Sequence, residues 1–137
     1  MRGLVARLPG VVAALWWGSL STTGFLVVPL LFKHLATPAI AGAMAARLFT
    51  AQTWVSMACA LLLLMASRSA RSPETAARVH AALPFVLTGL LLALLAEFGV
   101  APRIVARDNL ALWHAVGSGM YLLQWISAAV VLWRLQR

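Results

Sequence analysis

The sequence predicts an all-α protein, a four-helix transmembrane bundle with antiparallel neighbours and a long second helix. Of its 137 residues, 63% are hydrophobic and only 10% are charged. A soluble domain carries about 25% charged residues and could not hide this much apolar surface from water. Four apolar stretches are each long enough to cross the ~30 Å hydrocarbon core, which takes about 20 helical residues. Lipid offers no hydrogen bonds to the backbone, so these stretches are expected to be helices.

The expected spans lie within one membrane domain that covers residues 1–137, a length that suits a single domain. They cover approximately residues 11–32, 48–67, 82–101 and 110–133.

The first span is expected to stay on the protein as an uncleaved helix. Arg2 and Arg7 precede it, as in a signal peptide, but the apolar run exceeds the roughly 7–15 residues of a signal sequence, and no A-x-A cleavage site follows. Within it, Ala14, Gly18 and Thr22 recur every four residues. Small residues at this spacing allow helices to approach closely, so they predict a helix-packing face.

The second helix is expected to begin before its span. Thr37 is a suitable N-cap and Pro38 suits the first helical position. A helix from there to Ser67 would be roughly 45 Å long at 1.5 Å per residue, longer than the bilayer core. Residues 38–48 therefore either project, lie along the membrane surface, or belong to a strongly tilted helix.

The third helix is expected to have a start at Ser72, an N-cap candidate ahead of Pro73 and Glu74. Pro102 biases Ala101 away from helical geometry, which predicts that the helix ends there. The connection "RIVARDN" to the fourth span is short. The third and fourth helices are therefore expected to be antiparallel neighbours.

The positive charges predict the orientation. Seven basic residues are expected on the side that holds both termini and four on the other, so the termini are expected in the cytoplasm of a bacterial-type inner membrane. The seven are Arg2, Arg7, Arg68, Arg71, Arg78, Arg134 and Arg137; the four are Lys33, Arg47, Arg103 and Arg107. These charges flank apolar runs, as topogenic charges beside lipid headgroups do, and do not indicate a nucleic-acid partner. Trp16, Trp17 and Trp133 are expected near the inner membrane interface.

Glu97 is the acid in the third span, and polar side chains are expected to gather around it in the outer third of the bundle. The candidate polar cluster consists of Glu97, His114, Arg47, Gln52 and Arg103. A lone acid at the bilayer centre costs about 2.5–3.5 kcal/mol, so it needs a cation, a donor or a proton. His114 is the leading candidate partner, because the short loop makes its helix a neighbour, with Arg47 and Arg103 as alternatives.

Two interpretations of Glu97 stay open. In the first, a buried polar pair fixes how the helices pack. In the second, the cluster binds a proton, a cation or a small polar ligand. On the fourth span, His114, Gly117, Ser118 and Tyr121 share a helical face with Gln124 or Trp125. That face is expected to point into the bundle, as a helix-packing seam or as a ligand groove.

No catalytic residues are predicted. The chain has no Walker loop, no G-x-G-x-x-G motif and a single cysteine, Cys59. Haem ligation by His34 and His114 is not expected, because His34 is expected beyond its helix. Copper binding is not expected either, because Met and Cys are ordinary core residues; the soft side chains concerned are Met44, Met57, Met65 and Cys59. We therefore expect no metal, no cofactor and no enzymatic activity.

In the order of its features, the chain resembles the transmembrane protein 205-like family, whose bacterial branch is described as domain of unknown function 4149. The similar segments are "LWWGSLSTTGFLVVPLLFK", "ARLFTAQTWVSMACA", "EFGVAPR" and "LWHAVGSGMYLLQ". Members of that family often carry Asn at the position of Glu97. The resemblance implies a four-helix membrane protein and brings no established activity or cofactor.

Two functions are expected from these observations. The first is a small inner-membrane protein in contact with the lipid bilayer that acts by association with itself, as a homo-oligomer, or with a larger membrane complex. The alternative is a small transporter or channel component for a proton, cation or small polar solute, which would use the polar cluster around Glu97.

Overall fold

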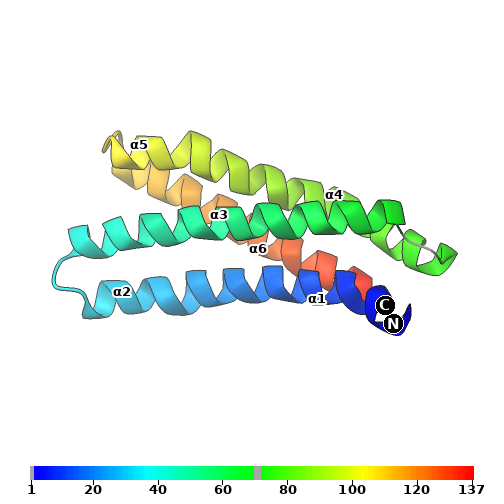
Figure 1. Ribbon diagram of the computed structural model, residues 1–137. Helices are drawn as coiled ribbons and strands as arrows, with labels where there is room; N and C mark the ends of the chain where they lie inside the picture. Colours follow the sequence, from blue (N-terminus) through cyan, green and yellow to red (C-terminus); the bar gives the residue numbers. More distant parts are fainter. Residues whose placement is uncertain (1, 70–71) are drawn as a thin grey trace.

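The structure is a computed structural model that describes residues 2–69 and 72–137, with side chains from residue 7 onward. Over these residues the chain is helical between short connections (Figure 1). The elements are α1 (Arg2–Ser21), η1 (Thr22–Val27), α2 (Val28–His34), α3 (Pro38–Ser69), α4 (Pro73–Leu95), η2 (Ala96–Val100), α5 (Ala101–Val105) and α6 (Leu110–Gln136), where η denotes a π-helix.

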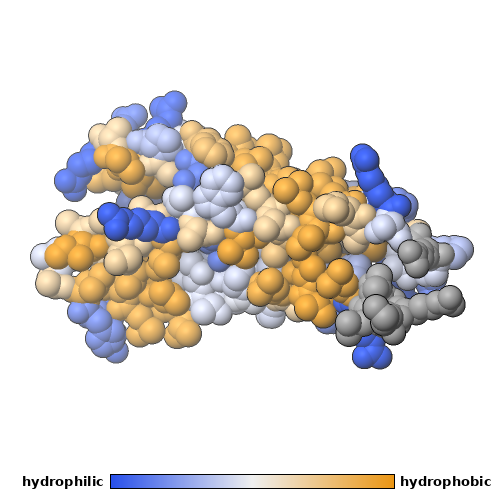
Figure 2. Space-filling view, in the orientation of Figure 1, coloured by the Kyte–Doolittle hydropathy of each residue, from blue (hydrophilic) through white to orange (hydrophobic). Residues whose placement is uncertain are grey.

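The described residues contain four continuous helical stretches that are long and apolar enough to cross a membrane. They are Arg7–His34, Pro38–Ser69, Pro73–Val105 and Leu110–Gln136. In the space-filling view, hydrophilic side chains gather toward the two ends and apolar ones cover much of the middle (Figure 2). The all-α, four-helix membrane fold predicted from the sequence is confirmed.

The helices lie side by side as an up-and-down bundle. Both chain termini lie at one end, together with the end of α3 and the start of α4 (Figure 1). At the other end, α2 packs on α3, and α5 packs on α6. We call this second end, formed by η1, α2, η2, α5 and the first halves of α3 and α6, the open end.

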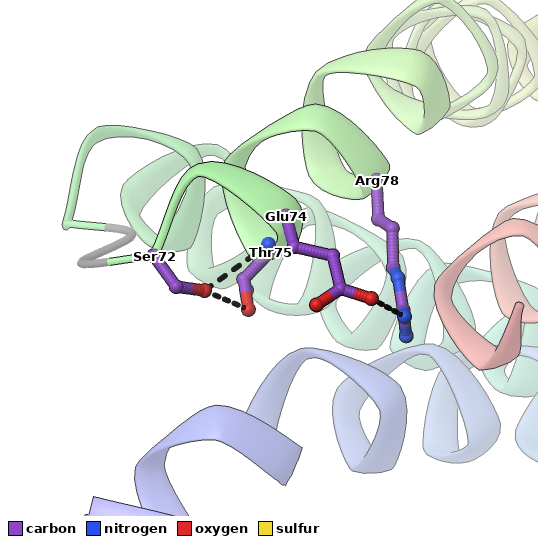
Figure 3. Close-up of polar contacts among 4 residues, drawn as sticks. All are labelled: Ser72, Glu74, Thr75 and Arg78. Atoms are coloured by element: carbon purple, nitrogen blue, oxygen red, sulfur yellow. Dashed lines mark hydrogen bonds and ion pairs between the residues drawn. The ribbon is translucent and has the colours of Figure 1, made fainter.

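The starts of α3 and α4 are capped as the sequence predicts. The Thr37 hydroxyl accepts a hydrogen bond from the Ile40 amide at 3.2 Å, and the Ser72 hydroxyl accepts one from the Thr75 amide at 3.2 Å (Figure 3). Arg78 pairs with Glu74 one turn into α4 (Figure 3). The long second helix is also confirmed, because residues 38–48 continue α3 and pack beside α2, which extends the bundle at the open end.

The prediction that the third helix ends at Ala101 is wrong. Ala101 has helical torsion angles (φ −56°, ψ −42°), and the helix continues as α5 to Val105. In η2 the Ala101 amide donates to the Ala96 carbonyl, five residues back. A proline inside a helix lacks an N–H and clashes with the carbonyl four residues before it. The wider π turn relieves this conflict just before Pro102, so the helix is not broken.

The first helix contains a matching feature. In η1 the Val28 amide donates to the Thr23 carbonyl, again five residues back, and Pro29 follows. The two segments, "FLVVP" (25–29) and "FGVAP" (98–102), share the pattern F-x-V-x-P. The sequence alone suggested no repeat, and the correspondence becomes visible because both segments form a π turn at the same end of the bundle (Figure 1).

The best-packed part of the bundle lies between the middle and the end with the termini. Its core comprises Val12, Ala13, Trp16, Leu20, Cys59, Ala60, Leu63, Ala82, Val86, Ala128 and Val131. Trp16 is 0% exposed, so its ring packs in the core and does not face the lipid as a side chain of an aromatic belt does. The Trp16 ring lies against Gly89 of α4, where an added Cβ would be 2.7 Å from the ring. Glycine is therefore what allows the largest core side chain to fit.

The small-residue face of α1 points away from the core. Ala14 and Thr22 are exposed, and nothing lies within 4 Å of a Cβ built on Gly18. The face that packs inside the bundle instead contains Trp16 and Leu20. Large side chains gain more van der Waals contact on burial than small ones do, which explains why this face is the one turned inward.

We predict that Gly89→Ala destabilises the fold, because its new methyl group overlaps the Trp16 ring. Overpacking of this kind costs about 1–3 kcal/mol. Gly119→Ala is the matched control, since a Cβ built there has free space, and it should be neutral or stabilising by up to about 1 kcal/mol. Unfolding by sodium dodecyl sulfate, followed by circular dichroism, measures both; equal effects of the two variants would contradict the proposed close contact.

Candidate functional site

A layer of hydrogen bonds joins the helices near the middle of the bundle. The Gln52 side chain of α3 bridges to the first helix: its Nε2 donates to Ser19 Oγ at 2.9 Å, and its Oε1 accepts from Thr23 Oγ1 at 3.1 Å. Gln124 of α6 donates from Nε2 to Ser56 Oγ of α3 at 2.8 Å. Gln52, Ser56 and Gln124 are buried, so these bonds satisfy polar groups that lipid and core cannot.

Two aromatic side chains of α6 complete this layer. The Tyr121 hydroxyl donates to the Leu20 carbonyl at 2.7 Å, just before η1. Trp125 Nε1 donates to Ser21 Oγ at 2.8 Å. Tyr121 reaches its position because Gly24 has no side chain, and an added Cβ there would be 2.4 Å from the Tyr121 ring. We refer to Ser19, Ser21, Thr23, Gln52, Ser56, Tyr121, Gln124 and Trp125 as the polar layer.

Beyond the polar layer, the open end contains a cavity of about 470 Å³. Figure 2 shows this end of the molecule hollowed between α3 and the α5 segment. Its apolar wall includes Phe25, Val28, Phe32, Phe49, Val100 and Ile104. Its polar lining consists of Gln52, Thr53, Glu97, His114, Ser118, Tyr121 and Gln124.

Glu97 lies in η2, and its partner is a hydroxyl on α3. The Thr50 Oγ1 donates to Glu97 Oε1 at 2.8 Å, and among the described residues no ion pair involves Glu97. The expected pairing with His114, Arg47 or Arg103 is therefore not what the structure shows. That expectation followed from the short loop that makes α6 a neighbour of the third helix, whereas in the structure Glu97 bonds to α3. Because the helix continues past Pro102 to Val105, Glu97 lies inside the helix and not at its end.

The structure divides the predicted polar cluster. Glu97, Gln52 and His114 all line the cavity. Arg47 is exposed and is not part of the lining. Arg103 stacks over the Trp113 ring, 4.6 Å from its centroid, and lies 3.8 Å from Asp108. Long basic side chains extend to the polar boundary because their charge is costly inside the bilayer.

The predicted face of α6 borders the open-end cavity, where His114 and Ser118 are exposed, and it turns into the bundle at Gln124, which is buried. Gly117 lies against η2 and α5, since a Cβ built there would be 3.4 Å from Val100 and 3.9 Å from Ile104. His114, Ser118 and Tyr121 line the cavity. The face is thus a packing seam at the glycine and a cavity wall on either side of it.

Sequence reasoning missed Thr50 and the aromatic wall. Thr50 was not singled out because a threonine in an apolar helix usually bonds back to its own helix, as Thr53 does with the Phe49 carbonyl at 3.1 Å. Phe49 packs edge-on against Tyr121, with ring centroids 5.2 Å apart. Three of the spans carry aromatic residues close to the predicted polar positions at the same end. This recurrence is the sequence pattern that could have predicted the aromatic wall.

Compared with known protein families, residues 11–111 match the family described as domain of unknown function (DUF4149). The chain belongs to the DUF4149 family. The matched region contains both π segments, Thr50 and Glu97. Neither the curated proteins nor the solved structures compared with the chain give a match.

In this DUF4149 chain, the Thr50–Glu97 bond should couple α3 to η2 energetically. A double-mutant cycle of Thr50→Val and Glu97→Ala, each of which removes the bond, is expected to give a coupling energy of about 0.6–1.7 kcal/mol, the range of hydrogen bonds between membrane helices. The readout is the free energy of unfolding in detergent.

A second cycle, of Glu97→Gln and His114→Ala, should show coupling close to zero, because these side chains share the cavity without a bond. Thr88→Val is the control for loss of a hydroxyl, since Thr88 bonds only its own helix at the Pro84 carbonyl. Coupling that is strong for His114 and absent for Thr50 would contradict the observed arrangement.

Proposed function

We propose that this integral membrane protein works by binding a small solute in its open-end cavity, without catalysis, as a carrier or as a component of a transport system. The observation that supports this proposal is a cavity of about 470 Å³ between membrane-spanning helices, with the Glu97 carboxylate in its wall. Ligand cavities are typically about 300–1,000 Å³, mostly apolar, with a few polar groups. Ionisable groups within the membrane are costly and are generally associated with function.

The cavity is closed on one side. The polar layer and the core around Trp16 and Leu20 fill the bundle between the cavity and the end with the termini. A solute that enters at the open end therefore reaches a binding site and not a pore. Passage across the membrane would require the helices to move apart or a second copy to complete a pathway.

We infer that the protein lies in a bacterial-type inner membrane with both termini in the cytoplasm, so that the open end faces outward. The termini lie at one end of the bundle (Figure 1), and six of the ten basic residues in the described part of the chain belong to that end. A C-terminal fusion to green fluorescent protein should fluoresce, whereas a C-terminal fusion to alkaline phosphatase should be inactive. We further infer from the four similar segments that the chain represents the bacterial branch of the transmembrane protein 205-like family.

We predict that Ser118→Trp fills the cavity and abolishes solute binding, because Ser118 lies in its wall. The chain contains isoleucine at positions 40, 104 and 126. Of these, Ile104 lines the cavity, whereas Ile126 is exposed on the surface of α6. The methyl resonances of ¹³C-labelled isoleucine thus report cavity and surface binding separately.

Benzyl alcohol titrated onto the wild type in nanodiscs should shift the Ile104 signal saturably and leave Ile126 nearly unmoved. Leu61→Trp is the matched control, because Leu61 is exposed in the other half of the bundle, and it should behave as the wild type does. An Ile104 signal that moves only linearly, in step with Ile126, would indicate partition into lipid and would refute the proposed binding function.

Association is the second candidate function, and the outward-facing small residues of α1 favour it. Ala14 and Thr22 are exposed, and Gly18 has free space around it. Such a face lets a second membrane helix approach closely. We propose that it contacts another copy of the chain or a larger membrane complex.

Gly18→Leu is expected to shift the protein from dimers toward monomers, because the side chain would hold a second helix away. Gly119→Leu is the control, since Gly119 also has free space but lies on α6. Subunit counting by photobleaching in liposomes measures the change. A wild type that is wholly monomeric and purifies without a partner would contradict this candidate.

A further inference from the structure

We propose that the cavity selects an organic cation, a mostly apolar molecule with one positive charge, and that Glu97 is its counter-ion. This inference rests on the proposed function, in which the open-end cavity binds a small solute. It adds the charge and the chemical class of that solute, which cavity size alone does not give.

The first argument is the charge of the lining. Glu97 is the single acidic side chain among the lining residues, and the lining contains no lysine or arginine. The nearby cations do not neutralise it: Arg47 and Lys33 are exposed and outside the lining, and Arg103 lies against Trp113 and Asp108. A carboxylate in an apolar wall favours a ligand that brings the missing positive charge.

The second argument is the unfilled hydrogen-bonding capacity of Glu97. An ionised carboxylate accepts about four hydrogen bonds through its two oxygens. Oε1 accepts one, from Thr50. Within the described residues, no side chain donates to Oε2. An ammonium group or another polarised cation placed in the cavity would supply that contact.

The third argument is the aromatic wall. Phe25, Phe32, Phe49 and Tyr121 all line the same cavity as Glu97. Aromatic faces attract cations within about 6 Å, most strongly where water is excluded. Carbon-rich cations suit such a wall, because their charge is spread and their hydration is weak.

An inorganic ion fits this lining less well. Calcium needs about six to eight oxygen ligands, and magnesium about six in octahedral order. The cavity provides one carboxylate, and its amides and hydroxyls are largely engaged in the polar layer, as for Gln52 and Gln124. The lining therefore favours an organic cation over a metal ion.

The test compares two probes of the same shape. Benzyltrimethylammonium and neopentylbenzene differ in having a charged nitrogen or a neutral carbon at the branch point. Each is titrated onto the protein in nanodiscs of zwitterionic lipid, and binding is read from the saturable shift of the Ile104 methyl signal, with Ile126 as the lipid reference.

Three variants separate the causes. Glu97→Gln removes the proposed counter-ion and keeps the side-chain shape. Asp108→Asn removes an acid at the same end that is exposed and outside the cavity, so it controls for surface attraction of cations. Ser118→Trp fills the cavity and controls for binding elsewhere.

The wild type is expected to bind the cation at least about tenfold more tightly than the neutral probe, because the ion pair of the quaternary ammonium with the Glu97 carboxylate contributes at least that factor. Glu97→Gln should remove that preference and leave the affinity for the neutral probe unchanged. Asp108→Asn should leave the affinities for both probes unchanged. Ser118→Trp should abolish the binding of both probes. Equal binding of both probes in the wild type, lost only in Ser118→Trp, would overturn the charge selectivity and leave the binding function intact. If neither probe binds saturably and benzyl alcohol does not either, both the charge selectivity and the proposed binding function are overturned.

Discussion

The shape of the open end depends on how two membrane-spanning helices accommodate a proline. Pro29 and Pro102 each remove a backbone donor where lipid cannot replace it. A π turn lies immediately before each proline. These turns are closed by backbone hydrogen bonds from the Val28 amide to the Thr23 carbonyl and from the Ala101 amide to the Ala96 carbonyl. These wider turns keep the helices continuous. Glu97 lies within one of these turns, and the Leu20 carbonyl that accepts a hydrogen bond from the Tyr121 hydroxyl lies just before the other.

The polar layer divides the bundle into two parts with different physical character. Toward the termini, large side chains such as Trp16 and Leu63 pack as a core, and glycine at position 89 allows the close fit. Toward the open end, the bundle contains the cavity. A bundle that needed only stability would fill that space with side chains, because a void forfeits van der Waals contacts. The cost of the void is the physical reason for considering it as a site.

Glu97 links the two interpretations that the sequence left open. Its bond to Thr50 joins η2 to α3, as a helix clamp would. Its place in the cavity wall leaves capacity for a ligand, as a binding site requires. An amide at this position could accept the same bond from Thr50 and would add no charge. The hydrogen bond to Thr50 therefore does not require a negative charge at position 97. The charge of Glu97 is explained instead by a bound solute of opposite charge.

The sequence by itself determined the features that depend on local chemistry. Hydrophobic length gave the four spans, and the hydroxyls of Thr37 and Ser72 beside prolines gave the helix starts, because capping involves only residues three apart. The sequence also predicted that Gln52, Glu97 and His114 lie at one end of the bundle, where all three line the cavity. Only the tertiary structure decided which face of α1 is buried, that Trp16 lies in the core, and that Thr50 is the partner of Glu97. These outcomes depend on how helices distant in sequence fit together, which hydropathy and regular helical spacing do not contain.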